Sequence, residues 1–347
     1  MRYLGRAAVA VLVLGSVSTS ASEWESRGTQ PPRKVVVATT MYGIYGEHPG
    51  LTRRLQDAAE LIDRAAEAAV RQYPGEGLDL VVLTEGIISA SGDVEAAKRT
   101  VELEGPVLEQ MGGKAREHHT YVVLPVLLAE PDGRSSNAAV LLDRQGQVAG
   151  VYRKVHPVTD YPSDALEGGM APGSDFPVFD TDFGRLGIQI CWDMVFEDGW
   201  EALARQGAQI VALPTAAPQV ARPSAHALLG DYYVVSSTPA NNASIFNPLG
   251  MVDAQITEAG VLVHRLDLSY AVVHWIPGLE DGRSLSRRYG DRAGYTYYES
   301  EATGLFWSND PTTPISSMLQ ELGLMEMRPY IERNRRAQDA ARGAALD

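Results

Sequence analysis

Four reactive side chains stand at or near the ends of apolar segments. Cys191, the only cysteine among 347 residues, follows the alternating apolar run 186–190, and Glu85 and Lys154 close two other apolar runs. Glu167 lies between Lys154 and Cys191 in the sequence. A carboxylate beside a thiol can take its proton, a lysine can stabilise an oxyanion, and a second carboxylate can orient the lysine or a water. Together these groups indicate nucleophilic catalysis by a thiol.

The position of Cys191 allows two interpretations. Asp193 and the apolar-periodic run 200–205 predict a sharp turn into a helix, and a helix N-terminus favours thiolate over thiol. A lone cysteine is also commonly a small buried hydrophobe. Which interpretation holds depends on whether the other three groups reach the thiol.

The segments around these residues predict the elements that must position them. The predicted helices cover residues 51–73, 106–118 and 198–206. The predicted strands cover residues 33–40, 78–84, 120–128, 137–143, 147–153, 176–181, 186–190, 210–214, 231–237, 243–247, 250–256 and 260–267. Strands that alternate with helices and are followed by hairpins favour a layered α/β protein. Strands of one sheet can bring their carboxyl ends, and thus the reactive groups, to one crevice.

Five short motifs follow one another in an order typical of one enzyme family. They are the glutamate that ends the apolar strand at Glu85, the hairpin residues Asn137, Asp143 and Gly146, the segment Tyr152-Arg153-Lys154-Val155-His156, Glu167 ahead of Pro172-Gly173, and the segment from Gly187 to Asp193 around Cys191. In this order they resemble the nitrilase superfamily of carbon–nitrogen hydrolases. The resemblance covers residues 33–268, which we predict to be the catalytic domain.

The resemblance implies a fold and roles for the residues. The fold would be a four-layer αββα sandwich, with Cys191 as nucleophile and Glu85 as general base. Lys154 and the backbone N–H of Trp192 would support the oxyanion. Glu167 would be the second carboxylate.

Some implications of the resemblance leave alternatives open. Asp160 or Asp164 in the loop 157–174 could stand where Glu167 is placed. No metal or organic cofactor is implied, and the histidines show no metal-ligand spacing. Association into a homo-oligomer is expected. His156 and Asp193 are expected to be structural, the first orienting the loop and the second capping the turn.

The two ends of the chain differ from the catalytic segment. Residues 1–21 combine Arg2 and Arg6, an apolar stretch and small residues before a cleavage point, which predicts a signal peptide and export to the periplasm or medium. The apolar stretch is too short for a membrane span, so no membrane association is expected after cleavage. The net charge of −14 disfavours nucleic acid as a partner.

Residues 269–347 are predicted to be a C-terminal extension rather than a second domain. A helix is expected over residues 319–345. Apolar residues in the extension predict contact with a second subunit, namely Phe306, Trp307, Leu319, Leu322 and Leu324. The aromatic cluster around Tyr295, Tyr297 and Tyr298 is expected to serve packing or subunit contact.

These patterns predict an exported thiol hydrolase that cleaves a non-peptide C–N bond of a small molecule. An amide is favoured over a nitrile because Asp193 stands where many nitrilases carry glutamate. A nitrilase and an N-acyltransferase are alternatives within the family. A catalytically inactive binding protein of the same fold is the alternative from another class.

Overall fold

The computed structural model describes residues 26–90 and 100–343. The predicted signal peptide, residues 1–21, lies outside the described residues, and export stays a prediction. Across the two described ranges, no helix has the length and apolar character needed to cross a membrane.

The first of two six-stranded sheets runs in the order β12-β1-β2-β3-β4-β5. Its strands are β1 (Lys34–Met41), β2 (Leu80–Val82), β3 (Tyr121–Ala129), β4 (Ser135–Leu142), β5 (Val148–Arg153) and β12 (Gly260–Asp267). β1, β2 and β3 are parallel, while β4 is antiparallel to both β3 and β5. β2 and β5 therefore run in the same direction, and the residues that follow them lie at the same edge of the sheet.

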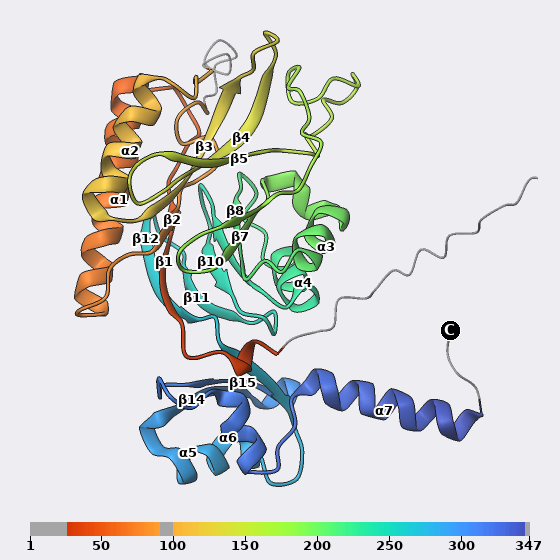
Figure 1. Ribbon diagram of the computed structural model, residues 1–347. Helices are drawn as coiled ribbons and strands as arrows, with labels where there is room; N and C mark the ends of the chain where they lie inside the picture. The colour runs from red at the N-terminus through yellow and green to blue at the C-terminus, as the bar shows by residue number, and fades with distance from the viewer. Residues whose placement is uncertain (1–25, 91–99, 344–347) are drawn as a thin grey trace, which may run out of the picture.

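Two helices cover the outer face of this sheet (Figure 1): α1 (Leu51–Gln72) and α2 (Pro106–His118). The face of α1 with apolar periodicity is the buried one, and Ile62 and Ala65 are fully buried against the sheet. Pro106 opens α2 at a position where its missing N–H costs nothing, and His119 ends it with a left-handed φ of 51°. Both helices lie where the sequence predicted them.

The second sheet runs in the order β11-β10-β9-β8-β7-β6. Its strands are β6 (Val178–Asp180), β7 (Arg185–Ile188), β8 (Ile210–Pro214), β9 (Tyr233–Ser237), β10 (Ala243–Phe246) and β11 (Val252–Ile256). The helices α3 (Asp198–Arg205) and α4 (Ala221–Gly230) cover its outer face (Figure 1). The sequence patterns predicted no element over the segment that forms α4.

The two sheets pack face to face, so the fold is the predicted four-layer αββα sandwich (Figure 1). Alternate residues of the facing strands form one core, including Val37, Val82, Ile188 and Val235, which are all fully buried. The edge where β2, β5 and β7 end lies over this core, and it is where the reactive residues lie.

After the sandwich the chain forms a third sheet, of order β13-β15-β14. It consists of β13 (Tyr270–His274), β14 (Ala293–Tyr298) and β15 (Thr303–Ser308), packed with α5 (Arg283–Tyr289) and α6 (Ile315–Glu321). Phe306, Leu319 and Leu324 are buried in the core of this unit. These three of the five residues named for a subunit contact are therefore covered by their own chain and give no reason for one, while the subunit contact itself stays a prediction.

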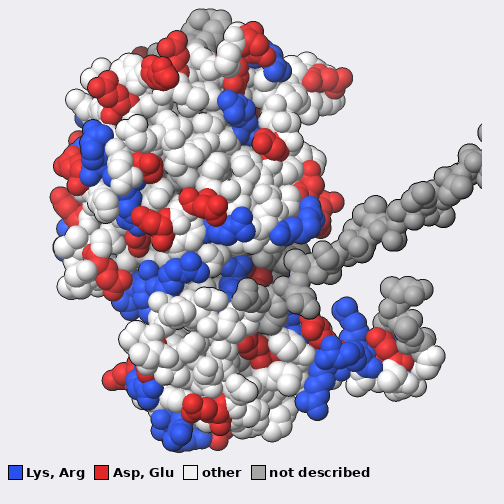
Figure 2. Space-filling model, in the orientation of Figure 1, with Lys and Arg blue, Asp and Glu red and all other residues white. Residues whose placement is uncertain are grey.

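The single helix predicted over residues 319–345 is also wrong. The chain leaves α6 after Glu321, turns at Gly323 with a φ of +68°, and starts α7 (Met327–Arg342). α7 extends away from the body and has no buried residue (Figure 1). Figure 2 shows basic side chains gathered over it, and the arginines of this helix are Arg328, Arg333, Arg335, Arg336 and Arg342.

Candidate active site

The structure brings together Glu85, Lys154, Glu167 and Cys191. Lys154 Nζ lies 3.5 Å from Glu85 Oε1 and is hydrogen-bonded to Glu167 Oε1. Glu85 and Lys154 both act electrostatically on the Cys191 thiol. The groups that follow β2, β5 and β7 thus meet between the sheets, where the first sheet supplies base and lysine and the second supplies the thiol.

Glu85 is held by neutral donors as well as by lysine. Asn137 Nδ2 donates to Glu85 Oε1 at 2.9 Å, and the backbone N–H of Ala216 donates to Glu85 Oε2 at 2.6 Å. The residue is 8% exposed. Both carboxylate oxygens are therefore fixed in direction, as a base that must meet a proton at one place requires.

Lys154 is buried between two carboxylates. It is 1% exposed, and burial alone would lower the pKa of its ammonium. The charges of Glu85, Cys191 and Glu167 outweigh that effect, and the pKa of Lys154 is raised above its ordinary value. Lys154 is therefore a permanent cation at the site, which suits support of an oxyanion rather than proton transfer.

Glu167 is presented by a strained loop. It adopts a φ of +42°, its Oε1 accepts the backbone N–H of Val158 at 3.0 Å, and its Oε2 accepts Asn137 Nδ2 at 3.2 Å. Asp160 instead accepts the backbone N–H of Gly168 at 2.8 Å, and Asp164 is exposed. Of the three acids that the sequence left open, Glu167 is the one that contacts Lys154.

Cys191 occupies a tight turn directly after the second sheet. It begins the short 3-10 helix Cys191–Val195 with a φ of +46°, a conformation that costs a non-glycine residue about 1–3 kcal/mol. Its thiol contacts Thr215 and the backbone N–H of Ala216. The surrounding contacts must hold this strain, and they aim the thiol at the site.

The predicted preference of Cys191 for thiolate is wrong for the resting site. Burial and the charge of Glu85 raise the pKa of the Cys191 thiol to about 12, although Lys154 and the hydrogen bonds from Thr215 and Ala216 oppose them. A 3-10 helix of five residues cannot offset this desolvation. The thiol is protonated at neutral pH, so a base must remove its proton during attack.

Asp193 and His156 hold the turn in place. Asp193 is fully buried; its Oδ2 accepts the backbone N–H of Ile190 and the hydroxyl of Tyr152, each at 2.8 Å. Its Oδ1 accepts the backbone N–H of His156 at 2.9 Å, and the His156 ring stacks on Phe196 at 4.1 Å. One carboxylate therefore joins the turn of the nucleophile to the strand and loop that carry Lys154.

Two contributors were not assigned a role from the sequence. Asn137 entered only as part of a motif, yet its single amide nitrogen donates to both Glu85 and Glu167. Ala216 contributes a backbone N–H to Glu85, and a pattern of side chains in the sequence cannot predict such a contact. The available signal for Asn137 was an amide directly ahead of the apolar run 138–142, because a buried amide needs hydrogen-bond partners.

Trp192 directly follows the nucleophile. Its side chain is 37% exposed, and its N–H lies in the first turn of the short helix, where helical geometry provides no acceptor. The oxyanion role of this N–H stays a prediction.

A second cluster of acidic and histidine side chains is formed by residues other than the four reactive ones. Asp63, Glu117 and His118 approach one another closely enough to share an ion. Lys114 Nζ already lies 2.8 Å from Asp63 and 2.9 Å from Glu117. The ammonium offsets one of the two carboxylate charges of this cluster.

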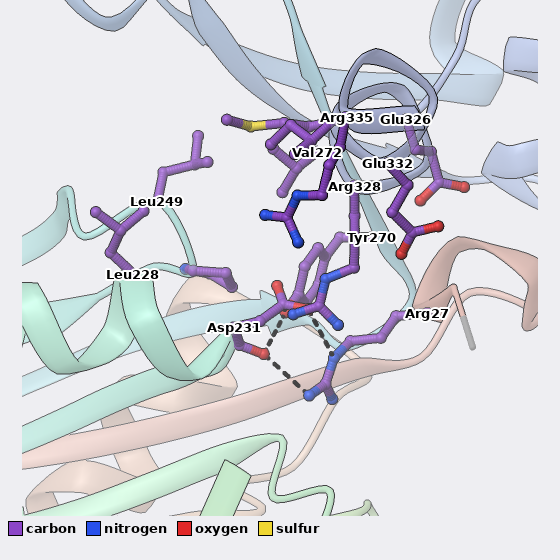
Figure 3. Close-up of a pocket in the computed structure, with 13 residues that line it drawn as sticks. Arg27, Leu228, Asp231, Leu249, Tyr270, Val272, Glu326, Arg328, Glu332 and Arg335 are labelled. Atoms are coloured by element: carbon purple, nitrogen blue, oxygen red, sulfur yellow. Dashed lines mark hydrogen bonds and ion pairs between the residues drawn. The ribbon is translucent and has the colours of Figure 1, made fainter. Parts of the chain in front are cut away.

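A pocket of about 420 Å³ lies apart from the four reactive residues, between α4, β13 and α7 (Figure 3). Apolar residues such as Leu228, Leu249 and Val272 line it, and Tyr270 donates to Asp231 on its floor at 3.0 Å. None of the predicted catalytic residues lines this pocket, and it belongs to the junction between the sandwich and the C-terminal unit.

The chain is similar to proteins named as amidases and to one named as a citrullinase. N-carbamoylputrescine amidase of Arabidopsis thaliana is 33% identical over 159 residues, covering 44% of this chain and 52% of that protein. Citrullinase of Francisella tularensis is 35% identical over 115 residues, covering 33% and 39%. The chain thus spans about half or less of the length of these relatives. Omega-amidase of Xenopus laevis is 26% identical over 244 residues, covering 64% of this chain and 86% of that protein.

The fold has close counterparts among solved structures. The amidase from Nesterenkonia sp. superposes with a TM-score of 0.57 at 20% identity, covering 67% of this chain and 90% of that one. A family model for carbon-nitrogen hydrolases matches residues 45–273, which include all four reactive residues. The predicted resemblance is confirmed, and this chain belongs to the carbon–nitrogen hydrolase family of the nitrilase superfamily.

Proposed function

We propose that this protein is a thiol amidase that hydrolyses a non-peptide carbon–nitrogen bond of a small molecule. One observation supports the proposal most: buried Lys154 lies between Glu85 and Glu167, beside the protonated thiol of Cys191. A buried ammonium with two carboxylates is costly to maintain for stability alone. It is suited to a reaction that moves a proton and creates an oxyanion.

In the first half of the reaction Cys191 Sγ attacks the amide carbon while Glu85 takes the thiol proton. The carbonyl oxygen becomes an oxyanion that the Lys154 ammonium and the N–H of Trp192 stabilise. Glu85 then gives its proton to the leaving amine or ammonia, because an amide nitrogen cannot leave unprotonated. The product of this half is a thioester on Cys191.

In the second half a water attacks the thioester. Glu85, now a carboxylate again, takes a proton from this water, and Glu167 keeps Lys154 directed at the second oxyanion. Collapse of the adduct breaks the C–S bond, the thiolate recovers its proton from Glu85, and the carboxylic acid is released. The raised pKa of Cys191 makes the base essential in both halves.

Nucleophilic attack by the cysteine on carbon has a parallel in a relative, as an alkylation rather than an acylation. In a variant of the Nesterenkonia amidase, the acetamide moiety of fluoroacetamide is added covalently at the active-site cysteine. Relatives named as amidases also support an amide as the substrate here.

The test is a carboxamide and the nitrile of the same acid, assayed with purified protein for acid and ammonia. We expect the amide to have the higher kcat/KM. A higher kcat/KM for the nitrile would contradict the amidase assignment and leave the thiol mechanism standing. Addition of an amine acceptor, with product identified by mass spectrometry, separates hydrolysis from N-acyl transfer, and C191A is the control for both.

We also propose that the protein is exported and cleaved before Ser22. The order of basic, apolar and small residues over residues 1–21 supports this. Intact-mass measurement of protein from the exported fraction should give a chain starting near Ser22, whereas a full-length cytoplasmic chain would contradict it.

A further inference from the structure

The loop between β1 and α1 reaches across the mouth of the active site. Tyr45, in this loop, donates its hydroxyl to the backbone carbonyl of Ala216 at 3.0 Å. Ala216 follows β8 of the opposite sheet, and its N–H holds Glu85 at 2.6 Å. The Tyr45 side chain therefore links the first sheet to the second at Ala216, the residue that also bonds the candidate base Glu85.

Hydrogen bonds from Arg54 and His48 fix the backbone around Tyr45. Arg54 is 2% exposed and donates to the carbonyls of Ile44 and Ala90, each at 3.1 Å. The ring of His48 bonds the carbonyl of Ile88 at 3.0 Å and accepts the N–H of Gly50 at 3.0 Å. These bonds tie the loop to the segment that follows Glu85, so the position of Tyr45 is built into the site.

Tyr45 combines this fixed position with an open ring. Its side chain is 70% exposed although its hydroxyl is satisfied. Partial burial and the charges of Cys191 and Glu85 raise the pKa of its phenol, which places the phenol within electrostatic reach of both groups. An exposed aromatic face beside a nucleophile is a surface on which a flat or apolar ligand group can pack.

The charges of the site favour a neutral substrate. Lys154 is the cation that acts on the Cys191 thiol, and it is already bonded to Glu85 and Glu167. Two carboxylates against one ammonium leave a net negative site. Within residues 26–90 and 100–343, Lys154 is the cation recorded as acting on the Cys191 thiol, so the two carboxylates would repel a carboxylate on the substrate.

We propose that Tyr45 is a specificity-determining residue that forms one wall of the substrate pocket, and that the site selects neutral amides whose acyl group presents a flat apolar face. The proposal rests on the proposed amidase function. It names the substrate class of that site.

The first experiment needs no substrate, because Cys191 is the only thiol. Iodoacetamide and N-benzyl iodoacetamide each form an S–C bond with Cys191, release iodide and pass the thiol proton to Glu85, and mass spectrometry gives both rates. In Tyr45→Ala the rate with the benzyl reagent, relative to iodoacetamide, should fall by about tenfold. Tyr45→Phe keeps the ring and should stay within about twofold of wild type.

Trp275→Ala is the matched control, since Trp275 is an aromatic residue with 58% exposure directly after β13. Its ratio should equal that of wild type. An unchanged ratio in Tyr45→Ala, with a wild-type melting temperature, would overturn the role of the wall.

The second experiment uses turnover of benzamide, acetamide and the monoamide of succinic acid. Tyr45→Ala should raise the ratio of KM for benzamide to KM for acetamide by about tenfold, whereas Tyr45→Phe, which also lacks the hydroxyl, should keep this ratio within about twofold of wild type. Higher kcat/KM for the succinic monoamide than for its neutral methyl ester would overturn the selection of neutral amides. A changed alkylation ratio without hydrolysis of any amide would support Tyr45 as a wall of the pocket and contradict the proposed amidase function.

Discussion

The sandwich and the C-terminal unit bury different kinds of side chain. Besides its apolar cores the sandwich buries charged side chains: Glu85 pairs with Lys154, and Asp193 pairs with His156. The C-terminal unit, residues 270–324, has a core of aliphatic and aromatic residues such as Leu285 and Phe306. The family match ends at residue 273, where the second kind of core begins.

This difference separates the requirements of chemistry from those of stability. Buried charges cost desolvation free energy, which apolar packing of the same volume would avoid. An apolar core returns about 1.5–3 kcal/mol for each large side chain that it buries. Substitutions of the buried charged residues near Cys191 should therefore change turnover more than stability, and substitutions in the apolar core of the C-terminal unit should do the reverse.

The largest effect on turnover is expected for Cys191→Ala. Without a nucleophile no thioester forms, and turnover of any amide should fall to background while the melting temperature changes little, since only one sulfur is removed. Steady-state kinetics and thermal melting of the purified variant measure this. Retention of wild-type kcat would contradict the thiol mechanism.

Glu85→Gln and Lys154→Met should each lower kcat by at least about 10²-fold, the scale of losing a general base or an oxyanion donor. They should move the Cys191 pKa in opposite directions. The charge of Glu85 raises that pKa and the charge of Lys154 lowers it. Glu85→Gln therefore lets thiolate form at lower pH, and Lys154→Met delays it to higher pH.

The pH dependence of iodoacetamide alkylation tests this opposite shift. Wild type, with a thiol pKa of about 12, lies between the two variants. Shifts in the same direction for both variants would show that the charges do not act on the thiol as the geometry requires.

Glu167→Gln should lower kcat by about 10- to 100-fold, because Lys154 loses the partner that directs it. Asp160→Asn is the matched control from the same loop, whose carboxylate serves the N–H of Gly168 instead. The control should keep most of the activity. The reverse outcome would mean that Asp160 is the second carboxylate.

Local rules predicted the strands and helices of a layered α/β protein, and the resemblance to the nitrilase superfamily implied the four-layer sandwich. Alternating apolar residues identify strands such as β7, and Pro106 marks the start of α2. The strand ends also predicted that Glu85 and Cys191 would meet, but as residues of one sheet, whereas they follow strands of two facing sheets. The sequence did not predict the third sheet, because β13 pairs with β15 across some 30 residues of chain. It did not predict the pKa of the Cys191 thiol either, because that pKa depends on burial in the folded protein.

Phe306→Ala should destabilise the protein by about 3–5 kcal/mol while leaving kcat within twofold below the melting transition. Phe306 is fully buried and stacks on Tyr295 with centroids 5.5 Å apart. Denaturant unfolding and kinetics at low temperature measure the two effects. A large fall in kcat in the folded variant would mean that the C-terminal unit takes part in positioning the site.

The smallest effect on turnover is expected from changes in α7, which we propose mediates self-association. α7 carries five arginines and has no buried residue, whereas the chain as a whole has a net charge of −14. A basic helix on an acidic protein can bind an acidic surface of a second copy, and salt should weaken that contact.

Light scattering should give an oligomer at low salt and a smaller species at 1 M salt. Arg333→Glu with Arg336→Glu should give the smaller species at low salt with kcat unchanged, whereas Arg64→Glu with Arg71→Glu, equally exposed on α1, should not. A monomer at every salt concentration would remove α7 as an interface and leave the division of labour between the two regions intact.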